Sequence, residues 1–386
     1  MPFADLAADL DALDARGLRR HRRVTEGPPG AHAILDGREL LAFCSNDYLG
    51  LAGDPRLIAA AQAGAGRYGV GAGASHLILG HSAAHHALEN ALAQFVRMPR
   101  ALLFSTGYMA NIGIVTALAG RGDAVFADKL NHASLNDAAA LSRAVFRRYR
   151  HGDLAALEKL LAASTGRRKL VVSDAVFSMD GDIAPVPELL RLCERYGAWL
   201  LLDDAHGFGV LGATGGGVLQ HFGVGAHRII YMATLGKAAG VFGAFVAGEP
   251  DLIETLVQRA RPYIYTTAMP PLLAHALLTS LEIIAAESWR RARLAALIDQ
   301  LKAGAAGWCW RLLPSATAIQ PLVIGSNDET LRVAAALAGR GILVPAIRPP
   351  TVREGTARLR ISLSAAHSEQ DVAQLIGALR EISAAA

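Results

Sequence analysis

The segments IIYMATLGKAAG (residues 229–240) and AWLLLDDAHG (residues 198–207) decide the fold that we expect for this chain. Each begins with an apolar run, which is typical of a strand buried on both faces of a parallel sheet. Chemically active side chains follow each run: Lys237 after the first, Asp203 and His206 after the second. Because ligands bind at the carboxyl ends of parallel strands, we expect these side chains at one edge of a sheet.

Lysine, aspartate and histidine at such strand ends are the groups needed to hold pyridoxal 5'-phosphate. In a crowded, partly dry site, the Lys237 amine loses its charge readily and can form a Schiff base with an aldehyde. Asp203 would keep the pyridine nitrogen protonated, so that the ring withdraws electrons. Taken singly, Lys237 could be a surface lysine and Asp203 a helix cap. The combination, in this order and after strands, favours the cofactor.

Strand and helix patterns alternate between about residues 55 and 250. Strands are predicted at 101–104, 124–127, 170–173, 199–202, 229–232 and 244–246, and helices at 56–68, 84–96, 107–118, 133–143 and 187–196. This alternation predicts an α/β fold whose large domain has a mostly parallel sheet covered by helices on both faces.

The two ends of the chain follow other patterns. A helix is expected over about residues 3–20, and Asp36-Gly37 between apolar runs predicts a tight turn. After residue 271 we expect a helical region over 272–305, then strands near 320–324, 343 and 358–363, with helices at 329–339 and 368–382. The predicted domains are an N-terminal helix and arm (1–54), a large cofactor-binding domain (55–275) and a small C-terminal α+β domain (276–386).

The composition is that of an ordinary globular enzyme, with 386 residues, 52% of them hydrophobic, and a formal net charge of +4. The basic run RGLRRHRR at residues 16–23 is either a solvated helix end or a site for a phosphorylated substrate. No accompanying motif favours nucleic acid.

No apolar stretch approaches the roughly 18 residues of a membrane span, so no membrane partner is expected. Acidic residues interrupt the N-terminal leucines where a secretory signal requires an apolar core. Three widely spaced cysteines predict reduced thiols without a disulfide or a metal site. We therefore expect a cytoplasmic protein.

Other strand ends carry weaker signals. Gly107 begins a helix after a strand and would let backbone N–H groups approach a phosphate, or it is only a turn glycine. His132 could stack on a flat ring or cap the next helix, and Ser178 could bind a ligand or form a turn. Arg348, in a loop stiffened by two prolines, is the candidate for a substrate carboxylate, or it forms a surface ion pair.

Several runs together resemble the α-oxoamine synthase family of fold-type-I pyridoxal-phosphate enzymes. They are SNDYLGL (45–51), SMDGD (178–182), DDAHG (203–207), TLGK (234–237), AIRPPT (346–351) and GTARLR (355–360). The resemblance covers essentially the whole chain. It implies the fold-type-I architecture, and the AIRPPT run points to the branch that serves biotin biosynthesis.

The resemblance also implies residue roles. Lys237 would bind the cofactor aldehyde, His132 would stack on the ring, Asp203 would pair with the ring nitrogen and His206 would bind the ring oxygen. The remaining cofactor contacts would be Gly107, Tyr108, Ser178 and Thr234, with Thr266 and Thr267 reaching the phosphate in a second subunit of a homodimer. Substrate contacts would be Arg19, Asn46, His132, Arg348 and Thr351.

The reaction implied is the decarboxylative condensation of L-alanine with pimeloyl-CoA or pimeloyl-acyl carrier protein. A sister enzyme using glycine or serine is the alternative. A simple aminotransferase is disfavoured because His206 stands where those enzymes commonly have tyrosine, and a non-catalytic subunit is disfavoured by Lys237 and Asp203. The chain departs from the family at His76 and Arg353, near substrate-facing loops.

Overall fold

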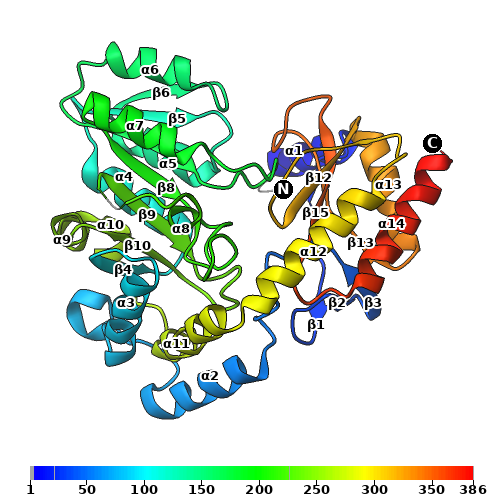
Figure 1. Cartoon of the computed structure of the whole chain (residues 1–386), viewed down its shortest axis with the longest axis horizontal. Coiled ribbons are helices and arrows are strands. Elements are labelled where there is room, and N and C mark those ends of the chain that lie inside the picture. The colour runs from blue at the N-terminus through cyan, green and yellow to red at the C-terminus, as the bar shows by residue number, and fades with distance from the viewer. Residues whose placement is uncertain (1–3, 21, 226, 386) are drawn as a thin grey trace. The chain divides into compact units, whose positions relative to one another are not determined.

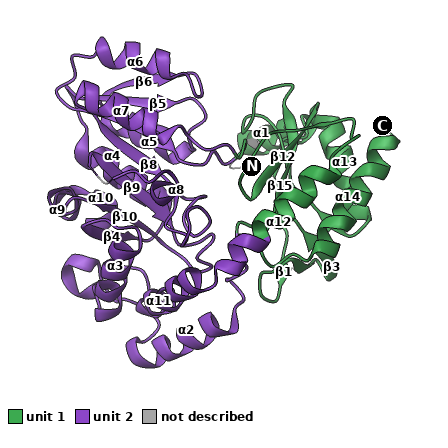
Figure 2. Cartoon of the chain, viewed as in Figure 1, with its two compact units in different colours: residues 1–46, 179–181, 294–386 green, residues 47–178, 182–293 purple. Residues whose placement is uncertain are grey.

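The computed structural model describes residues 4–20, 22–225 and 227–385 (Figure 1). Residues 3 and 21, which belong to the expected N-terminal helix and basic run, lie outside this part of the chain. The chain forms two compact units (Figure 2). Unit 1 comprises Met1–Asn46, Met179–Gly181 and Leu294–Ala386, and unit 2 comprises Asp47–Ser178 and Asp182–Arg293. The sequence-based division after residues 54 and 275 stays a prediction.

Unit 2 is built on a seven-stranded sheet with the order β4-β10-β9-β8-β7-β5-β6 (Figure 1). The strands are β4 (Arg100–Phe104), β5 (Ala124–Asp128), β6 (Val145–Tyr149), β7 (Lys169–Asp174), β8 (Trp199–Asp203), β9 (Ile229–Thr234) and β10 (Ala244–Gly248). The pairs from β6 through β9 are parallel, whereas β10 runs antiparallel to both of its neighbours. The predicted mostly parallel sheet is therefore confirmed, and β6 was not predicted.

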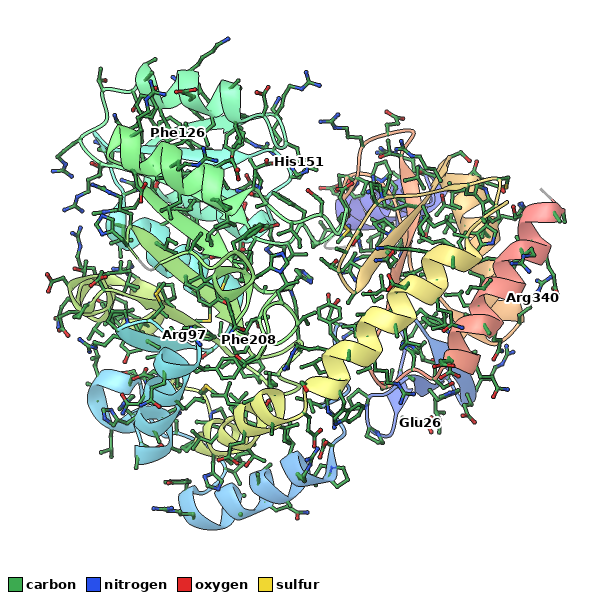
Figure 3. The ribbon with its side chains drawn as sticks, viewed as in Figure 1. Glu26, Arg97, Phe126, His151, Phe208 and Arg340 are labelled. Atoms are coloured by element: carbon green, nitrogen blue, oxygen red, sulfur yellow. The ribbon has the colours of Figure 1, made fainter. Side chains whose placement is uncertain are left out.

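Both faces of this sheet are buried. Val172, Leu201 and other residues of one face pack in a core with helices α4 (Gly107–Leu118) and α5 (Ala133–Ser142). Side chains alternate along a strand, and the intervening residues, such as Leu202, are buried as well. Phe126 of β5 lies in the interior of unit 2 (Figure 3). Continuous apolar strands were the sequence signal for this double coverage.

The other helices of unit 2 connect or cover these strands. They are α2 (Pro55–Tyr68), η1 (His76–Gly80), α3 (Ala83–Phe95), α6 (Leu154–Ala162), α7 (Val186–Tyr196), α8 (Val218–Phe222), α9 (Pro250–Arg259), α10 (Arg261–Ile264) and α11 (Pro271–Ala286). Of these, η1, α6, α8, α9 and α10 were not predicted; η1, α8 and α10 have five residues or fewer, whereas α6 and α9 carry an apolar period that was overlooked.

The helical region expected over 272–305 is confirmed, and it consists of two helices, because α11 ends at Ala286 and α12 (Ser288–Gly304) begins two residues later. Glu287 between them leaves the helical conformation, with φ −97° and ψ 65°. Its carboxylate accepts hydrogen bonds from Arg56 and Arg290, and serine at 288 favours a helix start. These contacts separate two helices whose apolar pattern is continuous.

Unit 1 contains two four-stranded sheets, with the orders β1-β2-β3-β13 and β11-β12-β15-β14. The strands are β1 (Thr25–Glu26), β2 (His32–Leu35), β3 (Arg38–Ala42), β11 (Arg311–Leu312), β12 (Ile319–Gly325), β13 (Ile342–Leu343), β14 (Ala346–Ile347) and β15 (Ala357–Ser362). The helices are α1 (Ala4–Ala15), α13 (Asn327–Gly339) and α14 (Glu369–Ala384), together with most of α12.

The predicted turn at Asp36-Gly37 is confirmed. Leu35 pairs with Arg38, and both turn residues have positive φ, 49° and 74°, as a two-residue hairpin turn requires. Helix α1, in contrast, ends earlier than expected. Gly17 has φ 59°, and its N–H donates to the Asp14 carbonyl, so the chain leaves the helix before the basic run.

No single helix in the described ranges combines the length and the apolar character that crossing a membrane demands. Only α11 and α12, taken together as a bent pair, meet that test by length and composition.

Arg290 joins several loops of unit 2 from a buried position, with 8% of its surface exposed. Its guanidinium donates to the Leu49 carbonyl at 2.7 Å, to Asp54 Oδ2 at 3.0 Å and to Glu287 Oε2 at 2.8 Å. Arg56 also donates to Asp54, and chiefly this bond lowers the pKa of the Asp54 carboxyl.

We predict that Arg290→Met lowers the free energy of unfolding by about 3–5 kcal/mol, because it leaves buried acceptors and carboxylates without their cation. Urea denaturation followed by circular dichroism measures this. The control is Arg100→Ala, which breaks the exposed Arg100–Glu254 pair and should cost less than about 1 kcal/mol. Equal losses in the two variants would show that Arg290 is not a structural centre.

Candidate active site

A cavity of about 190 Å³ lies in unit 2, where strands β7, β8 and β9 end. Its lining includes the predicted residues Gly107, Tyr108, His132, Ser178, Asp203, His206, Thr234 and Lys237. Four further residues, Ser134, Asp174, Ala205 and Met232, also line it. The structure thus brings most of the predicted cofactor contacts to the carboxyl edge of the parallel strands, as the sequence pattern indicated.

Lys237 is held by the loop that follows β9. Thr234 Oγ1 donates to the Gly243 carbonyl at 2.9 Å, which ties the end of β9 to the start of β10. The Lys237 carbonyl accepts from Gly240 N, which closes a tight turn around the lysine. The amine is therefore presented from a fixed backbone and not from a mobile loop.

A chain of hydrogen bonds runs from the lysine into the core. Lys237 Nζ lies 2.8 Å from His206 Nε2, and His206 Nδ1 lies 2.6 Å from the hydroxyl of Tyr48, a fully buried residue. One ring nitrogen of a neutral imidazole donates and the other accepts, so a proton change at the amine alters the whole chain. Tyr48 belongs to the quoted SNDYLGL run, but sequence reasoning gave it no role.

Asp203 is oriented by two donors. Asn111 Nδ2 donates to its Oδ2 at 2.7 Å, and the Ala205 N–H donates to its Oδ1 at 3.1 Å. The carboxylate is 5% exposed and lies in the cavity lining beside Lys237. A fixed, buried carboxylate of this kind can hold a protonated ring nitrogen.

Asp174 is a second carboxylate that sequence reasoning missed. It is the direct partner of Asp203 in the register of β7 and β8, and its Oδ2 accepts from His132 N at 3.0 Å. Its other oxygen, Oδ1, is buried without a hydrogen-bond partner among the described residues. Burial and the neighbouring Asp203 raise the pKa of Asp174 well above the usual range. Its position at the end of a predicted strand was the sequence signal that could have identified it as a candidate site residue.

The donors of this cavity therefore fit pyridoxal phosphate. A lysine amine suits its aldehyde, and two buried carboxyl groups, one with a free oxygen, suit a positively charged ring. Gly107 begins α4, and Thr106 caps that helix by accepting from Met109 N at 3.1 Å. The first N–H groups of a helix have no intrahelical acceptor and favour an anion such as phosphate.

His132 caps the next helix, and its stacking on a ring stays a prediction. Its Nδ1 accepts from Ser134 N at 3.3 Å and lies 2.7 Å from Ser134 Oγ, so it caps α5, and its ring also lines the cavity. Tyr108, half exposed, donates its hydroxyl hydrogen to Asp137. Ser178 lines the cavity at the end of the segment that follows β7.

The remaining predicted residues lie elsewhere. Thr266 and Thr267, between α10 and α11, are not among the described residues that line this cavity. Arg19, Arg348 and Thr351 line another cavity, of about 620 Å³, within unit 1. Their roles, like those of the cavity residues in unit 2, stay predictions.

The unit 1 cavity combines cationic and apolar side chains. Leucines of α1 and the following turn form part of its wall. Arg348 donates to the Gly17 carbonyl, and Arg19 pairs with Asp14. Asn46 does not line this cavity, and its Oδ1 accepts from Arg360 at 3.2 Å.

Asp204, next to Asp203, faces away from the unit 2 cavity. Its Oδ2 accepts from the Tyr231 hydroxyl at 2.8 Å and from Val218 N at 2.7 Å, and the residue is fully buried. Burial raises the pKa of Asp204 to about 7. The structure therefore separates two adjacent carboxyl groups that the sequence alone could not distinguish.

We predict that the contribution of Asp204 to the stability of this protein falls between about pH 4 and pH 7. The pKa of this carboxyl rises from 3.8, its ordinary value, to about 7 in the fold. Between these values the unfolded chain has lost the proton that the folded chain still holds. Stability then decreases as pH rises, by at most ~1.4 kcal/mol per pH unit, with no contribution to the slope below both values.

Asp204→Asn should flatten this decline, which urea denaturation at several pH values measures. Asp174, whose pKa is also raised, will leave a residual slope. The control is Asp251→Asn on the exposed surface of α9, which should keep the wild-type slope. An unchanged slope in Asp204→Asn would contradict the proton assigned to this residue.

Comparison with known proteins identifies the family. Residues 38–379 match the family described as aminotransferase class I and II. The chain is 68% identical to an 8-amino-7-oxononanoate synthase of Nitrosospira multiformis, over 95% of this chain and 93% of that protein. It is 63% identical to the synthase of the same name from Nitrosomonas europaea, over 99% of both chains.

Solved structures agree on the fold. A serine palmitoyltransferase of Sphingomonas wittichii matches with a TM-score of 0.93 and 32% identity, covering 100% of this chain and 98% of the other. An 8-amino-7-oxononanoate synthase of Francisella tularensis matches with a TM-score of 0.78 and 31% identity, covering 89% of this chain and 97% of the other. These matches confirm the resemblance drawn from the motifs, and the chain belongs to the 8-amino-7-oxononanoate synthase family within the class I and II aminotransferases.

Proposed function

We propose that this chain condenses L-alanine with a pimeloyl thioester in a reaction that depends on pyridoxal phosphate. The products are 8-amino-7-oxononanoate, CO₂ and the free thiol of the carrier, and the product serves biotin biosynthesis. The observation that carries the proposal is the cavity of unit 2, which combines Lys237, His206 and Asp203 in a chain 68% identical to a synthase of that name.

Lys237, Asp203 and the first turn of α4 would hold the cofactor through its aldehyde, ring nitrogen and phosphate, respectively. His132 would cover the ring, and His206 would bind the ring oxygen. When bound, pyridoxal phosphate would supply an electron-withdrawing ring, linked through the amino nitrogen of the amino acid to its α-carbon.

The chain's own residues would manage the protons. The Lys237 amine would remove the α-proton of alanine, and His206 Nε2, which lies 2.8 Å from Lys237 Nζ, would share that proton. Tyr48 holds the His206 ring at Nδ1 and fixes which side faces the lysine. Asp203, fixed by Asn111 and Ala205, would keep its negative charge directed at the ring nitrogen.

The carbon–carbon bond then forms between the alanine α-carbon and the thioester carbonyl, and the thiolate leaves and takes up a proton. Loss of the alanine carboxylate as CO₂ leaves an electron pair at the same carbon, and a proton from Lys237 restores neutrality. One lysine can perform both transfers because it is protonated by the first and deprotonated by the second.

The cavity of unit 1 supports a role in substrate recognition. Its arginines suit a carboxylate or a phosphate, and its leucines suit a hydrocarbon chain. We propose that Arg348 binds the alanine carboxylate and that Arg19 binds an anionic group of the pimeloyl carrier, with Thr351 in the same cavity. Asn46, which contacts Arg360 outside that cavity, is proposed as a further substrate contact. The carrier is coenzyme A or acyl carrier protein.

We further propose that the enzyme is a cytoplasmic homodimer in which Thr266 and Thr267 reach the phosphate site of the other subunit. Thr266 and Thr267 follow α10 and do not line the cavity of their own chain, which supports that assignment. Sedimentation equilibrium and cell fractionation test these two statements.

Lys237→Ala is predicted to abolish turnover, with a loss of more than ~10⁴-fold. General acid–base catalysis alone is worth ~10²–10⁴-fold, and the covalent attachment of the cofactor is lost as well. The measurement is thiol release from pimeloyl-CoA with L-alanine. Borohydride reduction and peptide mapping should place the label on Lys237 in the wild type, and a label on Lys129 or Lys169 would overturn the assignment.

The same assay decides the substrate. Wild-type enzyme should prefer alanine to glycine and serine, and a pimeloyl to an acetyl thioester. A preference for serine or glycine would instead favour a sister enzyme of the same family, and would leave the assignment of Lys237 intact.

Arg19→Ala is expected to raise KM for the thioester roughly tenfold, which corresponds to the loss of one charge-assisted hydrogen bond, and to change KM for alanine little. Arg348→Ala should raise KM for alanine and change KM for the thioester little. The Arg19 effect should shrink as salt increases, because exposed charges are screened.

Steady-state kinetics at two salt concentrations measure both effects. Arg340→Ala, an exposed arginine at the end of α13, is the matched control and should leave both KM values unchanged (Figure 3). Equal losses for both substrates in Arg19→Ala and Arg348→Ala would contradict this division of roles.

A further inference from the structure

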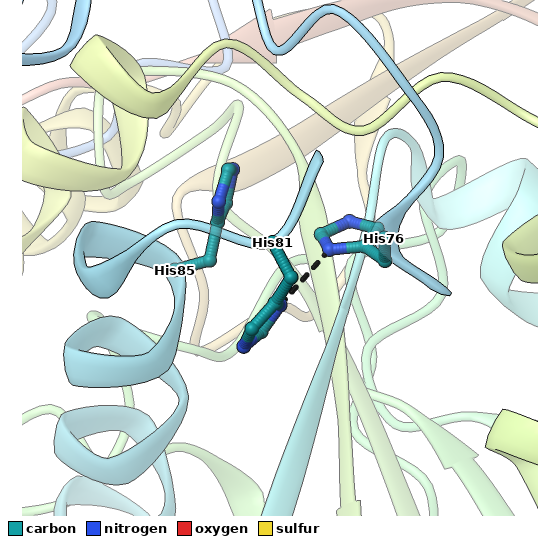
Figure 4. Close-up of side chains that lie close together, drawn as sticks. All are labelled: His76, His81 and His85. Atoms are coloured by element: carbon teal, nitrogen blue, oxygen red, sulfur yellow. Dashed lines mark hydrogen bonds between the residues drawn. The ribbon is translucent and has the colours of Figure 1, made fainter. Parts of the chain in front are cut away.

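Three histidines meet where the chain enters α3, and none of them lines the cavity of Lys237 (Figure 4). His76 begins η1, His81 follows that turn, and His85 lies in the first turn of α3. One ring nitrogen of each lies within 4.8 Å of one nitrogen of each of the others. The proposed reaction uses none of these rings.

The spacing of the first two rings suits a common metal ion. His76 Nδ1 and His81 Nδ1 are 3.1 Å apart. Two nitrogens bound to a tetrahedral zinc at about 2.0–2.1 Å lie roughly 3.3 Å apart, so the change needed is a few tenths of an ångström. The metal would replace the single hydrogen that the two nitrogens now share.

His85 can supply the third nitrogen if its Nδ1 gives up its contacts with Ser82 N and Oγ. Its Nε2 donates to the Met269 carbonyl at 2.8 Å, so its Nδ1 carries the lone pair, which now accepts from Ser82 N at 3.0 Å. Metal-bound histidines usually donate their other N–H to a carbonyl or a carboxylate. The Met269 contact can therefore remain while Nδ1 exchanges Ser82 for the ion.

The carboxylate of Glu89 lies near the Nε2 side of the His81 ring. Glu89 Oε2 lies 3.9 Å from His81 Nε2, and Glu89 Oε1 accepts from Leu103 N at 2.9 Å. With His81 bound through Nδ1, this carboxylate can accept from the opposite nitrogen, as second-layer carboxylates do at zinc sites. Tyr263 stacks on the His76 ring, with centroids 4.9 Å apart, and limits its rotation.

The rings are also in the form that binds metals. Burial lowers the pKa of each histidine, that of His76 to about 3, with neighbouring imidazoles adding to the effect for His76 and His81. Neutral imidazole is the ligand form, and it favours zinc, copper and nickel over calcium or magnesium. His81 is only half-buried, which leaves a path for an ion to enter.

We propose that His76, His81 and His85 bind one divalent transition-metal ion, zinc by preference, with Glu89 orienting His81. The ion would join η1 to α3 and fix the segment between them. His81, His86 and Glu89 form a competing set that shares one ligand with the first, so substitutions can tell the two sets apart.

The test uses the full chain, treated with EDTA and then saturated with pyridoxal phosphate so that the Lys237 cavity is filled. Zinc is titrated in at neutral pH against a chromophoric chelator. We expect one equivalent per chain, and at least a tenfold loss of affinity in His76→Gln and in His81→Gln. Glu89→Gln should lose about 10–100-fold.

The controls are His86→Gln, next to His85, and His221→Gln, an exposed histidine of α8, and both should bind as the wild type does. Thermal melting of each variant without zinc shows that it is folded, and zinc should raise the melting temperature only where the site is intact. Loss of binding in His86→Gln with full binding in His76→Gln would overturn the proposal, as would wild-type binding that is undetectable at 100-fold excess of zinc over protein.

Discussion

The double burial of the central strands is the constraint on which the rest of unit 2 depends. Strands β5, β7, β8 and β9 are buried on both faces, so almost every side chain along them must be apolar. Charged groups appear only at the ends of these strands. Asp174 and Asp203 end neighbouring strands in direct register, and Lys237 follows the next one. The sheet therefore brings charged side chains together at one edge while its core stays apolar.

Within that edge, the protein separates groups that are identical in chemistry. Asp203 and Asp204 are adjacent in sequence, yet one lines the cavity and the other is sealed against Tyr231 and the start of α8. Alternation along an extended chain turns successive side chains to opposite sides. The Asp203 carboxyl group can thus bind a ligand, whereas the Asp204 carboxyl group contacts only other protein groups.

The mostly parallel sheet and several of the cavity residues were predictable because each rests on a local signal. Continuous apolar runs marked the strands, and Lys237, Asp203 and His206 followed them directly. What escaped prediction depends on contacts distant in sequence. The break at Glu287 comes from Arg56, and the importance of Tyr48 comes from His206, 158 positions further along the chain. Asp174 is an exception, since its position at a strand end carried the same signal as Asp203.

The composition of unit 1 has a consequence for how the protein is made. Its β3 comes from the first 46 residues, yet the parallel neighbour of this strand is β13, some 300 positions later. A ribosome releases the amino end of the chain long before that neighbour exists. Unit 2, whose strands all lie between residues 100 and 248, can assemble during synthesis, whereas the hairpin of β2 and β3 must wait with an unpaired edge. The last fifth of the chain thus determines when the first tenth can fold, and slowed or truncated translation would endanger unit 1 first.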